Sequence, residues 1–173
     1  WDTESQKASV RHALEMAENL PVKVALSLSD PFCVERHHQD FNELIRSRVD
    51  LLFCNQEEAF TMMETQVTQE ALAGLSENVE TVVMTLGNRG SLICNQGQIY
   101  YIDPIEVEVI DTTGAGDAYA AGFLYGFSHD QSIMNCGRIA SVMAGTVIEQ
   151  IGPRIETASM KTLKERLSNI CLL

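Results

Sequence analysis

The segment Asp111-Thr112-Thr113-Gly114-Ala115-Gly116-Asp117 combines two glycines with a carboxylate at either end. Glycine at 114 and 116 allows the backbone to turn its N–H groups toward one point, and a helix that begins there adds the positive end of its dipole. Such a turn holds an anion. Asp117 is the only charged side chain from Thr112 to Ser128, so it places one carboxylate at the edge of the anion site. Phosphoryl transfer to a hydroxyl requires an anion site beside a lone base.

The same residues also fit an ordinary strand–turn–helix junction. Asp is a favoured N-cap, and Gly-rich turns commonly precede helices. A dinucleotide-binding turn is a poor alternative, because Tyr119 stands where the third glycine of G-x-G-x-x-G should fall. The chain contains no Gly-Lys-Ser/Thr, so it has no P-loop.

The segments around this loop predict an α/β fold with a mainly parallel, doubly wound sheet and helices on both faces. Residues 22–29 read as a strand buried on both faces, and further apolar strands are expected at 50–54, 81–86, 91–94, 99–103 and 107–110. Helical patterns cover 10–17, 35–48, 56–63, 68–77, 117–128, 131–150 and 158–170. Ligands bind such sheets at the carboxyl ends of strands, so we expect one crevice to gather Asn55, Gly87 and Gly114.

Bulk properties restrict the class of protein. A length of 173 residues suits one domain, 1–173, and the formal net charge of −12 argues against a nucleic-acid partner. No signal peptide or membrane-length apolar run is visible, so we expect no membrane partner and a cytoplasmic location. The five cysteines form no CxxC pair and are expected to be reduced thiols, buried where they lie in apolar segments: Cys33, Cys54, Cys94, Cys136 and Cys171.

Residues 111–126, DTTGAGDAYAAGFLYG, resemble the C-terminal signature of the ribokinase-like (PfkB) family of carbohydrate and nucleoside kinases. Two further motifs match that family in the right order, Asn55-x-x-Glu58 and Thr85-Leu86-Gly87-x-x-Gly90. Segments 27–37 and 137–154 look closest to bacterial adenosine-kinase-like members. The resemblance implies transfer of the γ-phosphoryl group of ATP to a hydroxyl of a sugar or nucleoside, with Mg²⁺ and a monovalent cation, K⁺, as cofactors. Adenosine-like acceptors are slightly favoured.

The resemblance also assigns roles to individual residues. Asp117 is expected to be the catalytic base, and the amides of Gly114, Ala115 and Gly116 are expected to form the anion hole. Glu58 would bind Mg²⁺ through water, although Asn55 and Glu58 equally form a capping box. The remaining nucleotide-binding candidates are Asn55, Thr85, Gly87, Arg89, Gly90 and Ser141.

A monovalent-cation site is implied at Asp111, Thr113 and Gly152. For Asp111 the alternative is a turn-initiating residue that bonds its own backbone. Glu156 falls near a position where the family often has a serine, which departs from the family pattern. For Ser141 the alternative is a small residue in a helix contact.

Family members are about twice as long as this chain, which resembles only their ATP-side half. The sequence therefore predicts a fragment that lacks the N-terminal half and the lid and is inactive by itself. Unpaired strand edges would then favour a homo-oligomer. Two other functions stay open: a non-catalytic nucleotide-binding or assembly module, and a phosphate-sugar binding domain without turnover.

Overall fold

The computed structural model describes Trp1 and residues 3–171. The chain divides into two compact units. The N-terminal unit comprises Trp1–Met84 with Cys94–Gln98, and the C-terminal unit comprises Thr85–Ile93 with Ile99–Leu173.

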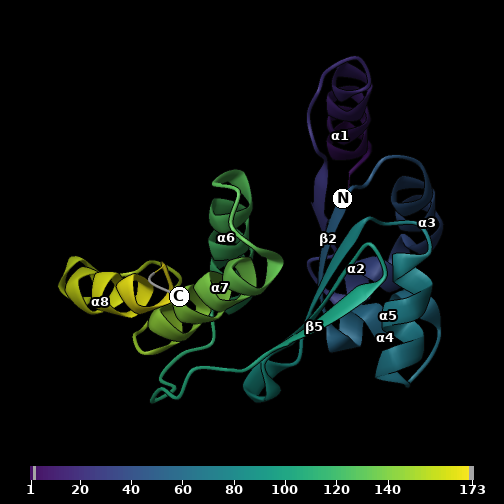
Figure 1. Ribbon diagram of the computed structural model, residues 1–173. Coiled ribbons are helices and arrows are strands. Elements are labelled where there is room, and N and C mark those ends of the chain that lie inside the picture. The colour runs from purple at the N-terminus through teal and green to yellow at the C-terminus, as the bar shows by residue number, and fades with distance from the viewer. Residues whose placement is uncertain (2, 172–173) are drawn as a thin grey trace. The chain divides into compact units, whose positions relative to one another are not determined.

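The elements follow the predicted order of alternating strands and helices (Figure 1). The first part of the chain forms α1 (Glu4–Ala17), β1 (Ala25–Ser27), α2 (Pro31–Arg36), α3 (His38–Ser47), β2 (Leu51–Asn55), α4 (Gln56–Met63), α5 (Thr68–Ser76) and β3 (Thr81–Thr85). The second part forms η1 (Gly87–Arg89), β4 (Ser91–Asn95), β5 (Gln98–Ile102), α6 (Ala115–Ser128), α7 (Ile133–Ile148), η2 (Thr157–Ser159) and α8 (Met160–Cys171).

The five strands are hydrogen-bonded in the order β1-β2-β3-β4-β5. Strands β1 and β2 are parallel, with Ala25 opposite Leu51. Only the turn Gln96-Gly97 separates β4 from β5, and so short a connection joins antiparallel strands. The sheet is therefore mixed, with the predicted hairpin at its end.

Two strand predictions were wrong. The strand expected at 22–29 is reduced to the three residues of β1, whose Ala25 and Ser27 are exposed, so it is not buried on both faces. Residues 107–110 form no strand, and Val109 and Ile110 are both 57 % exposed. The helix expected at 35–48 is interrupted at His37, which ends α2 and begins α3.

The core of the N-terminal unit lies around β2 and β3, each buried at its first four positions. Helix α3 contributes the predicted apolar side, with Phe41, Leu44 and Ile45 buried. Helices α4 and α5 pack against each other in the connection between β2 and β3. Strand β2 ends at Asn55, which is also the N-cap of α4, so the strand leads directly into the helix.

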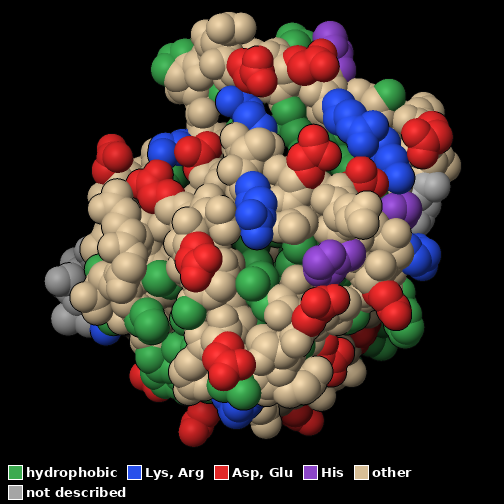
Figure 2. All heavy atoms as spheres, turned by 90° about the vertical axis from the view of Figure 1, so that its right-hand side faces the viewer, with side chains coloured by type: hydrophobic (Ala, Val, Ile, Leu, Met, Phe, Trp, Pro, Cys, Tyr) green, Lys and Arg blue, Asp and Glu red, His purple; other side chains and the backbone are tan. Residues whose placement is uncertain are grey.

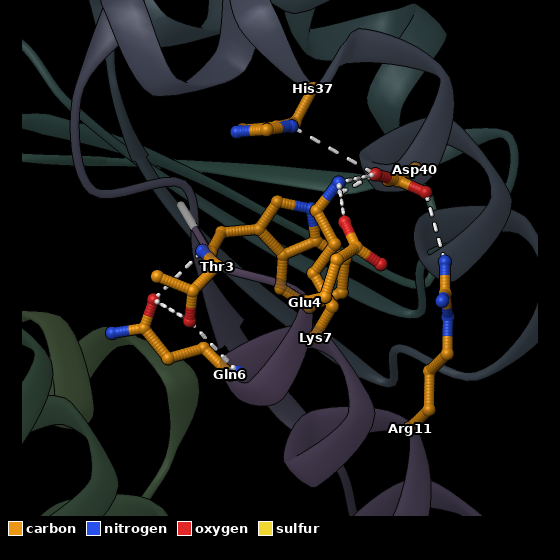
Figure 3. Close-up of polar contacts among 8 residues, drawn as sticks. Thr3, Glu4, Gln6, Lys7, Arg11, His37 and Asp40 are labelled. Carbon is orange, nitrogen blue, oxygen red and sulfur yellow. Dashed lines mark hydrogen bonds and ion pairs between the residues drawn. The ribbon is translucent and has the colours of Figure 1, made fainter.

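Helix α1 has no buried residue, and charged side chains link it to α3 (Figure 3). Lys7 Nζ lies 3.0 Å from Asp40 Oδ2, and Arg11 Nη2 lies 3.1 Å from Asp40 Oδ1. The Trp1 indole donates to the same carboxylate at 3.2 Å and stacks on Phe41 with a ring separation of 5.6 Å. Hydrogen bonding to Lys7 holds the pKa of Asp40 below its usual value. Asp40 is thus the common anchor of the first helix.

The C-terminal unit is built on the contact between α6 and α7, which is the most extensive between any two of its helices. Glycine permits this close approach: a Cβ at Gly122 would lie 2.8 Å from Ala140 Cα, and one at Gly126 would lie 3.0 Å from Cys136 Cα. Helix α8 then covers α7, where Ile139, Val142 and Leu163 form a buried cluster.

The surface agrees with the acidic composition. Figure 2 shows Asp and Glu side chains distributed over the visible face rather than gathered into one patch. Four of the cysteines, Cys33, Cys54, Cys94 and Cys136, are buried free thiols as predicted, whereas the side chain of Cys171 lies outside the described part of the structure. Among the described residues, no helix combines the length and the apolar character needed to cross a membrane.

Candidate active site

Gly114 begins helix α6 in a conformation that favours glycine. Its φ of 80° lies in the left-handed region, and it is the N-cap residue of the helix. A Cβ at this position would lie 2.5 Å from Pro153 Cβ and 2.9 Å from Pro153 Cα. Both the backbone conformation and the close approach of the segment after α7 therefore require glycine here.

The amide groups in the first turn of α6 point out of the N-terminal end of the helix. The first N–H groups of any helix lack intrahelical partners, which makes this end a site for anions. The Ala115 amide is engaged by the Thr112 carbonyl at 3.1 Å. A Cβ built on Gly116 meets no atom within 4 Å, so the space in front of this residue is open.

Asp117 is the third residue of α6 and the acidic residue of its first turn. Its side chain is exposed. The structure therefore places a carboxylate in the first turn of the helix, directly after the open backbone at Gly116, as the sequence predicted.

A cavity of about 770 Å³ lies within the C-terminal unit. That volume falls in the range of small-molecule sites, about 300–1,000 Å³. Its wall joins the loop after β3, the extended segment before Asp111, the start of α6 and one side of α7. The residues lining it include Thr85, Gly87, Asn88, Gly90, Ile105, Val107, Thr112, Ala115, Gly116, Tyr119, Ser141, Ala144, Gly145 and Ile148.

The segment 104–110 forms one wall of this cavity instead of the predicted strand. Ile105 and Val107 line the cavity, and Ile105 packs so closely on α7 that a Cβ at Gly145 would lie 2.3 Å from its side chain. Further along, the amides of Ile110 and Asp111 donate to the Ile148 carbonyl at the end of α7. Ile105 and Val107 thus face helix α7, a role that periodicity alone does not distinguish from pairing in a sheet.

The loop Thr85–Gly90 forms another part of the cavity wall. Gly87 has a φ of 63° with open space around it, and Gly90 has a φ of 83°. A Cβ at Gly90 would lie 2.0 Å from the Ile102 carbonyl oxygen, so this glycine is required by the approach of β5. Of the predicted nucleotide-binding residues of this loop, Thr85, Gly87 and Gly90 line the cavity together with Asn88, whereas Arg89 is exposed and does not line it.

Ser141 lies on the α7 side of the cavity and is 9 % exposed. Its hydroxyl donates to the Asp103 carbonyl at 3.1 Å. The side chain therefore ties α7 to the segment before Pro104 while it contributes to the cavity wall.

The three residues of the predicted cation site come together in space. The Asp111 carboxylate accepts from the Thr113 amide at 2.9 Å, the Thr113 hydroxyl at 2.7 Å and the Gly152 amide at 2.8 Å. These hydrogen bonds, the Thr113 hydroxyl first, lower the pKa of Asp111. The bond from the Thr113 amide is the one expected of a turn-initiating aspartate, so that alternative is confirmed. The ionised carboxylate is also a ligand of the kind that a monovalent cation takes, and the cation site stays a prediction.

Asn55 and Glu58 belong to the N-terminal unit and form a capping box. The Asn55 side chain accepts from the Glu58 amide at 2.8 Å, while the Glu58 carboxylate accepts from the Asn55 amide at 2.9 Å and its side-chain nitrogen at 2.6 Å. Burial raises the pKa of Glu58, which is 5 % exposed.

No group of three or more His, Cys, Asp or Glu among the described residues is arranged to hold a metal ion. Mg²⁺ bound with a nucleotide keeps several waters and takes only one or two protein carboxylates. Since both oxygens of Glu58 already accept hydrogen bonds within the cap, a contact through water suits it better than direct ligation.

The family model described as pfkB family carbohydrate kinase matches residues 1–159 of the chain. The chain belongs to the pfkB family. Its fold is accordingly ribokinase-like, and the resemblance seen in the three motifs is confirmed.

Individual kinases are similar to this chain. The adenosine kinase structure from Sinorhizobium meliloti is 36 % identical with a TM-score of 0.91, covering 95 % of this chain and 51 % of that one. The probable sugar kinase from Rhizobium etli CFN 42 is 35 % identical with a TM-score of 0.89, covering 95 % of this chain and 50 % of that one. An uncharacterized sugar kinase from Archaeoglobus fulgidus is 31 % identical over 120 residues, covering 69 % of this chain and 48 % of the relative. The chain thus spans about half the length of these relatives.

Several residues of the cavity wall were not predicted from the sequence. Ile105, Val107, Ala144 and Ile148 are apolar residues without a motif, and nothing in their spacing marks them as part of a site. Tyr119 was noted only as a break in a glycine pattern. Its position in the first turns of the helix after the Gly-rich loop was the available signal.

Proposed function

We propose that this chain is the nucleotide-binding part of an ATP-dependent kinase that phosphorylates a hydroxyl of a sugar or nucleoside. The observation that carries the proposal is the cavity in the C-terminal unit, whose wall contains both the loop Thr85–Gly90 and the open backbone at Gly116. Apolar residues on the walls suit a flat base, and amides at the start of a helix suit phosphate groups.

In the proposed reaction Asp117 takes the proton of the acceptor hydroxyl as it attacks the γ-phosphoryl group. Amides of the Gly114–Gly116 turn stabilise the charge on the phosphoryl oxygens. The Ala115 amide would first have to leave the Thr112 carbonyl, so we expect the Gly116 amide to contribute most.

Two ions accompany the proposed nucleotide. Glu58 would hold Mg²⁺ through water, and Mg²⁺ would neutralise the phosphate charge. A K⁺ ion would bind at Asp111, Thr113 and Gly152, where it supports the turn that precedes Gly114. The net charge of −12 on the chain repels the polyanionic ATP, and the two cations would offset part of this repulsion.

We propose a nucleoside as the acceptor, with a sugar as the alternative. The similarity to an adenosine kinase favours a nucleoside, and the similarity to sugar kinases keeps a sugar open. We expect a cytoplasmic protein, in keeping with substrates of this kind. We also expect the present chain alone not to turn over, since it spans about half of its relatives.

A non-catalytic nucleotide-binding module is the second candidate. One observation favours it: every residue that lines the cavity belongs to the C-terminal unit. The two candidates separate when a longer protein that includes this chain is supplied with ATP and nucleoside or sugar acceptors. Phosphorylated product supports the kinase, and ADP binding without product supports the module.

The first test is a calorimetric titration of the chain with ADP in the presence of Mg²⁺ and K⁺. We expect saturable binding that is lost in Gly116→Val and kept in Ala121→Val, which makes a comparable change at an exposed position of the same helix. Inorganic phosphate is the second ligand, because a phosphate-sugar site would bind it as well as ADP. A folded chain that gives no heat with ADP would contradict the proposal.

A further inference from the structure

A pair of buried hydroxyl groups lies beside the cavity. Tyr119 Oη is 2.5 Å from Ser91 Oγ, and the two residues are 5 % and 0 % exposed. Tyr119 also donates to the Gly137 carbonyl across a longer distance of 3.5 Å. Both hydroxyl protons have an acceptor when Ser91 donates to Tyr119 and Tyr119 donates to the Gly137 carbonyl. Burial raises the pKa of Tyr119 to about 12, so the phenol stays protonated at neutral pH.

The three partners lie on three segments that each contribute other residues or Tyr119 itself to the cavity wall. Ser91 directly follows Gly90, which ends the loop Thr85–Gly90. Tyr119 follows Asp117 by two residues on α6, and Gly137 precedes Ser141 by one turn on α7. A single hydroxyl group therefore joins the loop after β3, the start of α6 and the side of α7.

We propose that Tyr119 is a positioning residue that holds the loop Thr85–Gly90 and the turn Gly114–Asp117 at the separation that a nucleoside diphosphate requires. The inference rests on the proposed nucleotide-binding function. A ligand that touches both loops gains from both contacts only if the loops are already held at a matching distance. Adenosine or inorganic phosphate, which occupies one end of the site, does not depend on that distance.

The hydroxyl group can be removed with little change in packing. Phenylalanine keeps the ring of Tyr119 and leaves the cavity wall in place. The change deprives Ser91 of its buried partner, and a buried polar group without a partner is costly, so the two loops are no longer tied. Ser91→Ala removes the same hydrogen bond from the other side.

The test is calorimetry with three ligands: ADP with Mg²⁺, adenosine alone and inorganic phosphate alone. For Tyr119→Phe and Ser91→Ala we expect ADP affinity to fall by about 3- to 10-fold, the worth of one buried hydrogen bond. Affinity for adenosine and for phosphate should change by less than about twofold. The double variant should match Tyr119→Phe, because that change already removes the bond between Ser91 and Tyr119 together with the bond to Gly137. Tyr125→Phe is the matched control, since Tyr125 lies on the same helix and is 57 % exposed.

Hydrogen exchange of the ligand-free chain gives a second readout. We expect Tyr119→Phe to raise exchange in residues 85–90 and 114–117 together, and Tyr125→Phe to leave both unchanged. Unchanged ADP affinity in Tyr119→Phe overturns the inference, as does an equal loss for all three ligands. If the unmodified chain binds no ADP, the proposed function fails, and unchanged exchange in both loops then overturns the positioning role as well.

Discussion

The two glycines of the loop before α6 should respond in opposite ways to the same substitution. Gly114 has a φ of 80° and lies against Pro153, whereas a Cβ on Gly116 meets nothing within 4 Å. We therefore expect Gly114→Ala to destabilise the chain and Gly116→Ala to stabilise it slightly while it impairs nucleotide binding. The contrast separates a glycine needed for folding from a glycine needed for function.

The magnitudes follow from the backbone and the contacts. An L-residue in the left-handed region costs about 1–2 kcal/mol, and the overlap with Pro153 adds to this cost. Replacement of glycine by alanine at a compatible helical position stabilises by about 0.4–1 kcal/mol. In a chain of this size 1 kcal/mol shifts Tm by roughly 2–4 °C. Tm should thus fall by about 2–8 °C or more in Gly114→Ala and rise by about 1–4 °C in Gly116→Ala.

Thermal unfolding followed by circular dichroism measures the first effect, and calorimetry with ADP measures the second. Gly116→Ala places a methyl group against the proposed phosphate position, and overpacking of this kind costs about 1–3 kcal/mol, so ADP affinity should fall at least about fivefold. Equal losses of stability in the two variants would contradict the structural role of Gly114. ADP binding by Gly116→Ala as tight as that of the unmodified chain would contradict the functional role of Gly116.

Three further outcomes are expected. In a longer, active protein, Asp117→Asn should lower kcat by about 10²- to 10⁴-fold with little effect on ATP binding, and an unchanged kcat would remove Asp117 from the role of base. Asp40→Asn should release α1 and shift the emission of Trp1, the only tryptophan, to longer wavelength. Because the pKa of Asp40 is lowered, its carboxylate stays ionised until the pH falls below the ordinary pKa value of 3.8, and acid should shift the Trp1 emission only there. An emission shift that is complete at pH 5 would contradict the role of Asp40 in holding α1. Ile99→Lys on the end strand β5, where Ile99 is 54 % exposed, should weaken the predicted self-association in sedimentation velocity, and a chain that is monomeric before substitution would contradict that prediction.

Local sequence signals determined much of this protein. Helix α4 has the predicted bounds. Its start depends on one local feature, the capping box between Asn55 and Glu58. The hairpin β4–β5 follows from the turn Gln96-Gly97, where both residues have positive φ. The Gly-rich turn, the start of α6 and the position of Asp117 were likewise predicted, since each depends on residues only a few positions apart.

The tertiary structure decided what depends on distant residues. The segment 107–110 has the alternation of a strand, yet residues of this stretch line the cavity and pack toward α7. Strand β1 is short and exposed because apolar composition does not specify which neighbours cover a strand. The bond between Ser91 and Tyr119 joins residues 28 positions apart, and no local pattern indicates it. The residue types set the chemistry available at each position, whereas packing between distant segments decided which of these groups lie together in a site.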